Sequence, residues 1–206
     1  MVWLADDVLG FVRDALPEPP ARLLEVGAGG GELAEALRAD GYDVVAIDPA
    51  SESPEVRRVS LAELDEPASS FDAAAAIVSL HHVEPLAASC RHLASLVRPG
   101  GTLAVDEFDV EAFDEGAAGW WLANRDADCD HEATEPARLV ADLRDHIHPL
   151  ALVRETLGEW FALEEPTRGP YMHRWDMPPG LLDLEARLIA AGELPATGAR
   201  MVGRRR

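Results

Sequence analysis

The sequence contains no lysine, so its 18 basic residues are all arginine, and 38 Asp and Glu residues outnumber them. The formal net charge is −20. A surface with this charge repels phosphate backbones, and a nucleic acid is therefore not an expected partner. The only basic run, Arg204 to Arg206, is expected to be a solvated end.

Long apolar runs and paired cysteines are also missing. No apolar segment approaches the roughly 20 residues that cross a bilayer, and the first residues lack the basic segment of a secretion signal. Cys90 and Cys129 form no metal or redox motif, which favours two free thiols in a reducing compartment. We therefore expect a cytoplasmic protein with no membrane partner.

Apolar segments and helical segments alternate through the first half of the chain. This order is typical of an α/β, doubly wound parallel sheet with helices on both faces. Strands are expected at residues 22–26, 42–47, 56–59, 71–78 and 102–107, and helices at residues 32–39 and 85–97.

The alternation of expected strands and helices ends after Phe108, where the chain becomes acidic and contains Trp120 and Trp121. We expect one or two helices in residues 136–157, an extended segment at 171–175, a helix at 181–191, and strands at 160–164 and 199–203. The organisation is then a single domain, 1–206. It has an N-terminal helix within 1–20, and 109–157 form a lid insertion that closes over the ligand.

Four glycines occupy five positions in residues 27–31, between an apolar strand and a helix. Ligands of open α/β folds bind at this edge of the sheet, where a tight turn and a close ligand both require glycine. Glu25 comes two residues before the first glycine, and Asp48 ends the second strand, where a carboxylate can accept ribose hydroxyls.

Four motifs follow one another in register: EVGAGGG at residues 25–31, VVAID at 44–48, FDAAAAIVSLHHV at 71–83, and LVRPGGTLAV at 96–105. Together they resemble the class I S-adenosylmethionine-dependent methyltransferases, over the first half of the chain. The resemblance implies a seven-stranded, mainly parallel Rossmann-like sheet.

The resemblance also implies a cofactor site. Glu25 would hold the methionine amino group, directly or through water, and Asp48 the ribose hydroxyls. Many members carry an aspartate where this chain has Leu61, so Glu63 or backbone groups would serve the adenine instead. The full set of cofactor-binding residues expected is Glu25, Gly27, Ala28, Gly29, Gly31, Asp48, Pro49, Leu61, Ala62, Glu63 and Ser79.

His81 and His82 follow a buried strand where the resemblance puts the methyl group. One of them, with His82 preferred, is a candidate general base, and a base of ordinary pKa gives an acidic limb near pH 6.5. The alternative is that one or both histidines cap the following helix or pack in the core. Arg174 is a candidate for a substrate carboxylate, although an ordinary salt bridge is the stronger interpretation.

No metal is expected, because no pair of ligands has diagnostic spacing among Asp106, Glu107, Asp109, Asp128, His131, His146 and His148. The function predicted is methyl transfer from S-adenosyl-L-methionine to a small-molecule acceptor, with S-adenosyl-L-homocysteine as product. The alternative is a non-catalytic protein that binds the cofactor or a partner. The oligomeric state, monomer or homodimer, is left open.

Overall fold

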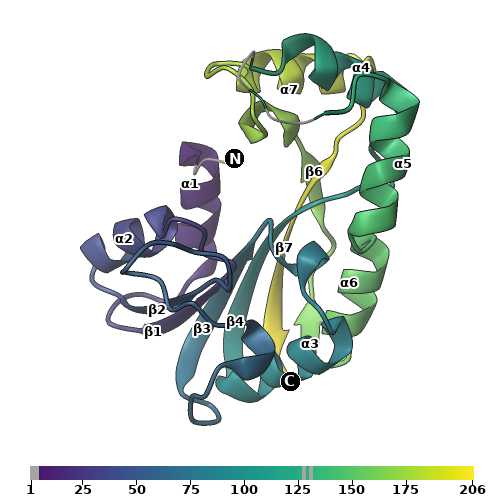
Figure 1. Cartoon of the computed structure of the whole chain (residues 1–206). Helices are drawn as coiled ribbons and strands as arrows, with labels where there is room; N and C mark the ends of the chain where they lie inside the picture. The colour runs from purple at the N-terminus through teal and green to yellow at the C-terminus, as the bar shows by residue number, and fades with distance from the viewer. Residues whose placement is uncertain (1–4, 127–128, 130–131) are drawn as a thin grey trace.

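The computed structural model describes residues 5–126, 129 and 132–206. Its centre is a seven-stranded sheet of order β2-β1-β3-β4-β7-β5, with β6 pairing to β7 (Figure 1). The elements are α1 (Asp6–Ala15), β1 (Arg22–Val26), α2 (Glu32–Ala39), β2 (Asp43–Ile47), η1 (Leu61–Glu63), β3 (Phe71–Ile77), η2 (Leu80–His82), α3 (Leu86–Leu96), β4 (Val97–Phe108), α4 (Glu115–Asn124), α5 (Pro136–His146), α6 (Leu150–Gly158), β5 (Phe161–Leu163), β6 (Thr167–Gly169), η3 (Met172–Arg174), α7 (Leu182–Ala190) and β7 (Gly198–Arg205).

The strands β2, β1, β3 and β4 pair in parallel, and β7 pairs antiparallel with β4, β5 and β6. Six strands therefore share one direction and β7 opposes them. The expected α/β sheet, mainly parallel and seven-stranded, is confirmed. None of the helices in the described part of the chain is both long and apolar enough to cross a bilayer.

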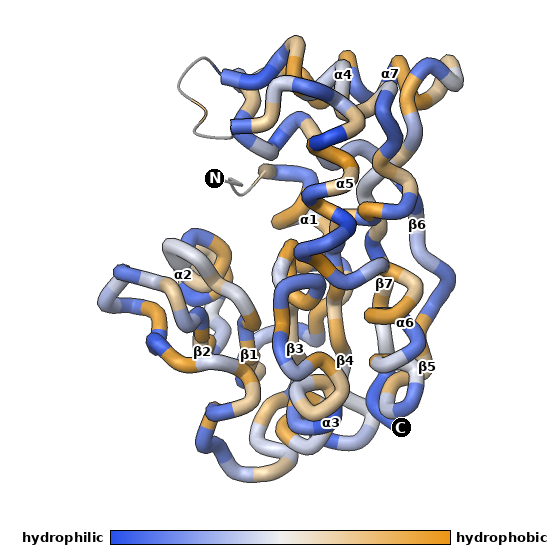
Figure 2. The backbone as a smooth tube through the Cα atoms, turned by 45° about the vertical axis from the view of Figure 1, so that its right-hand side comes forward, coloured by the Kyte–Doolittle hydropathy of each residue, from blue (hydrophilic) through white to orange (hydrophobic). Residues whose placement is uncertain are grey.

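Alternate residues of the strands supply two cores, one on each face of the sheet. On β1, Leu24 and Val26 join the core under α3 and α6, while Leu23 joins the core under α1 and α2. The apolar residues of β4 stand out as a hydrophobic segment in Figure 2. Because side chains alternate along a strand, Glu25 lies on the α1 and α2 face.

Two local predictions are wrong. Residues 56–59 are not a strand and make only one bridge to the sheet, from Arg57 to Ile47. Arg57 and Arg58 are exposed, so the segment has little apolar surface to pair and bury. Residues 171–175 are not extended either, because the buried carboxylate of Glu185 accepts the backbone N–H groups of Tyr171, Met172 and His173 and curls them into η3.

A second unit, the cap, stands beyond the carboxyl ends of the strands and consists of α4, α5, η3 and α7 (Figure 1). It has a hydrophobic cluster of its own, centred on Phe113, Trp121 and Met172. The lid range expected, 109–157, divides in the structure: α4 and α5 belong to this cluster, whereas α6 packs on the main sheet. The later elements η3 and α7 complete the cap, and whether the cap moves stays a prediction.

The cap core yields a stability prediction. Trp121 is fully buried, stacks on Trp175 with ring centroids 4.3 Å apart, and donates from Nε1 to the Trp175 carbonyl at 2.8 Å. Trp121→Ala should lower the free energy of unfolding by roughly 3–5 kcal/mol, measured by urea denaturation. The adjacent, half-buried Trp120→Ala is the control and should cost less than about 2 kcal/mol. Equal losses would contradict this packing.

Candidate ligand-binding site

The glycine loop, residues 27–31, turns from β1 into α2 in a conformation that only glycine adopts easily. Gly27, Gly29 and Gly31 have φ values of +72°, +53° and +95°. A Cβ on Gly27 would lie 2.2 Å from the Cβ of Ser79, so only glycine lets the loop come this close to the segment that follows β3. A Cβ on Gly29 would meet nothing within 4 Å, so this glycine borders open space.

Asp48 fixes the loop from the end of β2. Its Oδ2 accepts the Gly29 N–H at 3.0 Å, and its Oδ1 accepts the Ala50 N–H at 2.8 Å. Ser51 adds a hydrogen bond from its Oγ to the Gly29 carbonyl at 2.6 Å. Each carboxylate oxygen of Asp48 still has a lone pair for a ligand hydroxyl.

Two cavities meet over this loop. The glycine cavity, about 580 Å³, has Glu25, Glu32 and Arg174 among its lining side chains, and the η1 cavity, about 450 Å³, is bounded by η1 and by His82. Both volumes fall in the range of small-ligand sites. The two cavities share four lining residues and so form one trough along the edge of the sheet: Gly27, Asp48, Ala50 and Val78.

Glu25 is the buried acid of the glycine cavity, with 4% of its surface exposed. Its Oε2 has no hydrogen-bond partner among the described residues. Burial away from water raises its pKa to about 8, and the acids nearby add to this effect. A cationic group of a ligand would favour the ionised form of Glu25, and the two opposite charges would then attract each other.

The two adjacent histidines point to different places. The Nδ1 of His81 contacts Glu107, whose Oε1 accepts the N–H groups of Ser79 at 3.1 Å and Leu80 at 2.7 Å. His82 lies on the wall of the η1 cavity. The side chain of His82 is exposed in part, yet desolvation of its ring, and then the nearby His81, lower its pKa to about 4. The ring is therefore neutral at neutral pH.

The structure brings most of the predicted site residues to the trough. Glu25, Gly27, Ala28, Gly29 and Asp48 line the glycine cavity. The η1 cavity is lined by seven of the predicted residues: Gly27, Asp48, Pro49, Leu61, Ala62, Ser79 and His82.

Three predicted residues lie outside both linings. Gly31 caps α2, and His81 is buried against Glu107. Glu63, the proposed substitute for the missing aspartate at position 61, is exposed and accepts from Ser60 at 2.6 Å.

Two of the acids considered as metal ligands form ion pairs with arginines instead. Asp106 pairs with Arg174 and Arg200, and Asp109 pairs with Arg168. Among the described residues no three His, Cys, Asp or Glu side chains are grouped to hold a metal ion. Asp128 and His131 lie outside the described residues.

Sequence reasoning missed Ser51, considered Glu107 only as a metal ligand, and did not place Arg174 at the glycine cavity. Arg174 forms the salt bridge expected of it, with Asp106 at 2.5 Å, yet it also lines this cavity. No local motif marks these residues, because their partners are 22, 26 and 68 positions away in the chain.

Comparisons with known proteins identify the family of this chain. A family model described as a methyltransferase domain matches residues 4–162. A ubiquinone biosynthesis O-methyltransferase of Xanthomonas campestris is 39% identical over 110 residues, covering 46% of this chain and 46% of that protein. Its namesake from Methylocella silvestris is 36% identical over 113 residues, covering 47% and 44%. The chain spans about half the length of the curated relatives it matches.

Solved structures share the fold over nearly the whole chain. An S-adenosylmethionine-dependent methyltransferase from Mesorhizobium loti has a TM-score of 0.62 at 18% identity, covering 98% of both chains. A 1,6-didemethyltoxoflavin-N1-methyltransferase from Burkholderia thailandensis, solved with S-adenosylhomocysteine, has a TM-score of 0.54 at 20% identity, covering 90% of this chain and 71% of that chain. A cyclase has a TM-score of 0.62 at 18% identity, covering 97% and 81%.

Burial of Glu25 predicts a pH-dependent stability. The carboxyl ionises near pH 4.5 when unfolded but near pH 8 when folded, so the folded state holds one more proton between these values. The free energy of unfolding should fall as pH rises through this window, by a few kcal/mol at about 1.4 kcal/mol per pKa unit. Glu25→Gln should remove that loss in urea titrations at pH 5 and pH 8.

The control is Glu32→Gln, an exposed position of the same cavity that removes one negative charge as well. If both variants change stability equally at the two pH values, net charge rather than the burial of Glu25 explains the dependence.

Proposed function

The chain belongs to the methyltransferase-domain family, and we propose that it transfers a methyl group from S-adenosylmethionine to a small-molecule acceptor. One observation carries this proposal. The glycine loop, the buried Glu25 and the oriented Asp48 face one trough inside the matched residues 4–162.

The residues present fit such a cofactor. Glu25 offers an unpartnered carboxyl oxygen to an ammonium group, and open space beside Gly29 admits a ligand close to the backbone. The carboxylate of Asp48 is oriented by two backbone N–H groups and can accept two ribose hydroxyls. Leu61 and Ala62 present an apolar wall to an adenine ring, so hydrogen bonds to its edge would come from backbone groups.

S-adenosylmethionine, when bound, supplies an electrophilic methyl group, and the protein contributes position and a site with little water. The name of the curated relatives favours a hydroxyl acceptor. Neutral His82 would accept the proton of that hydroxyl as its oxygen becomes nucleophilic. Glu107 supports the turn that carries His82, because it holds the N–H groups of Ser79 and Leu80.

The rival is a protein that keeps this fold and binds without methyl transfer. The cyclase of similar fold is the specific observation behind it, since a fold hosts more than one chemistry. Incubation of the protein with S-adenosylmethionine and a fractionated metabolite extract separates the two. A methyltransferase accumulates S-adenosylhomocysteine and a methylated product, whereas the rival binds the cofactor and accumulates neither.

The glycine loop gives a binding prediction. Gly29→Ala places a methyl group in the trough at a left-handed backbone position, and S-adenosylhomocysteine binding by calorimetry should fall at least tenfold from a micromolar dissociation constant. Gly100→Ala is the matched control: its φ is +75°, a Cβ there also meets nothing within 4 Å, and it lies in β4 outside both cavities. Both variants should melt alike, so an equal affinity in the two would remove the loop from the site.

His82 gives a kinetic prediction. His82→Ala should lower kcat roughly a hundredfold while leaving the affinity for S-adenosylhomocysteine unchanged. Because the pKa is lowered to about 4, the acidic limb of the wild-type rate profile should lie near pH 4 and not near pH 6.5. The control is His146→Ala, because His146 is exposed and lines neither cavity. A loss of affinity with kcat intact would make His82 a binding residue and not a base.

A further inference from the structure

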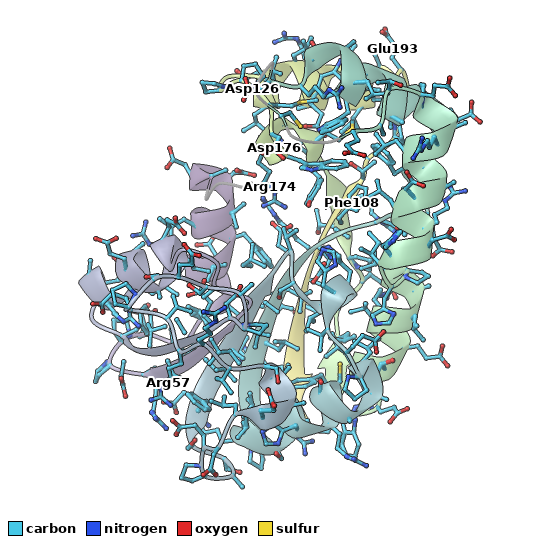
Figure 3. The ribbon with its side chains drawn as sticks, in the orientation of Figure 1. Arg57, Phe108, Asp126, Arg174, Asp176 and Glu193 are labelled. Carbon is cyan, nitrogen blue, oxygen red and sulfur yellow. The ribbon has the colours of Figure 1, made fainter. Side chains whose placement is uncertain are left out.

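The wall of the glycine cavity is assembled almost wholly from the first 80 residues, with one exception from the cap. The exception is Arg174, in η3, which lies beyond the matched residues 4–162. Figure 3 shows its side chain reaching from the cap toward α1 and the ends of the strands.

Arg174 is held in place by Asp106 and Tyr171. Its Nη1 and Nη2 donate to Asp106 at 3.2 and 2.5 Å, and its guanidinium lies 4.8 Å from the centre of the Tyr171 ring. The backbone of η3 is in turn pinned to Glu185 on α7. With 1% of its surface exposed, Arg174 cannot turn toward bulk water without breaking these contacts.

The guanidinium of Arg174 has hydrogen-bond donors left over. The two bonds to Asp106 use two of the five guanidinium N–H groups, and the buried Nε has no partner. A buried donor without an acceptor is costly, so its retention at a cavity wall points to an acceptor that arrives with a ligand.

The charges around the cavity indicate which chemical group of a ligand would accept this hydrogen bond. Glu25, Glu32, Asp48 and Glu52 are acidic, and Arg174 is the only cation among the described residues that line the cavity. A ligand carboxylate would be repelled everywhere except at Arg174. Glu25, on the same wall, suits an ammonium group, so the two residues together match the two ends of an amino-acid zwitterion.

We propose that Arg174 binds the carboxylate at the amino-acid end of S-adenosylmethionine, so that the cap completes the cofactor site. This inference rests on the proposed function. Asp106 sets the direction of the guanidinium without cancelling its charge, because Arg200 shares Asp106 through a bond of 2.8 Å from its Nε. Arg174 is then a binding residue, and it makes cofactor affinity depend on the packing of the second half of the chain.

Calorimetry with two ligands tests the proposal: S-adenosylhomocysteine and its analogue without the α-carboxylate. The wild type should prefer S-adenosylhomocysteine by roughly 10- to 100-fold, the range of a hydrogen-bonded charged group. Arg174→Met should lose most of this preference, with the affinity for the analogue changed less than about threefold. Equal weakening of both ligands, or an undiminished preference, would overturn the proposal.

Arg200→Met is the matched control, because it also removes a partner of Asp106 but does not line the glycine cavity, and it should keep the preference. Arg174→Met is checked first by its thermal melt. Should it fail to fold, the wild-type measurement alone decides, since equal wild-type affinities for the two ligands overturn the proposal. Wild-type protein that binds neither ligand would overturn the proposed function itself.

Discussion

The carboxylate of Asp106 is the interaction on which the arrangement of this molecule depends. It lies near the end of β4, is 1% exposed, and receives two arginines: Arg174 from the cap and Arg200 from β7. Arg200 continues the chain of ion pairs to Asp7 of α1 at 2.6 Å. A buried charge of this kind is tolerated only when its partners are all in place, so the sheet, the N-terminal helix and the cap are fixed relative to one another through one side chain.

The same arrangement shapes the trough. Asp106 follows Val105, whose side chain packs on the α3 and α6 face, so Asp106 points to the face of α1 and α2, where Glu25 also lies. Arg174 can reach the glycine cavity because it is drawn to Asp106 on that face. Glu107, one residue later, points to the opposite face and supports the turn that carries His81 and His82. Two consecutive acids of β4 thus organise the two ends of the site.

Polar groups at this edge are oriented before any ligand arrives. Asp48 is oriented by the N–H groups of Gly29 and Ala50, and the glycine loop by Ser51 and by contact with Ser79. Two of the buried side-chain atoms that lack a hydrogen-bond partner, Glu25 Oε2 and Arg174 Nε, belong to charged residues that line the glycine cavity. In the free protein each of these buried atoms lacks a hydrogen bond, which lowers stability. A ligand that supplies the missing partners removes this penalty when it binds, and this contributes to affinity.

The sequence by itself determined the doubly wound sheet and the glycine loop, because both depend on local patterns: apolar runs at strand spacing, and positive-φ turns that only glycine fills readily. It also placed Glu25 and Asp48 at the correct edge of the sheet. It misjudged residues 56–59 and 171–175, where strand formation depended on pairing partners and on the distant Glu185. Only the tertiary structure decided which histidine faces a cavity, that Glu63 does not, and that Arg174 belongs to the wall beside Glu25, because these contacts join residues that no periodicity relates.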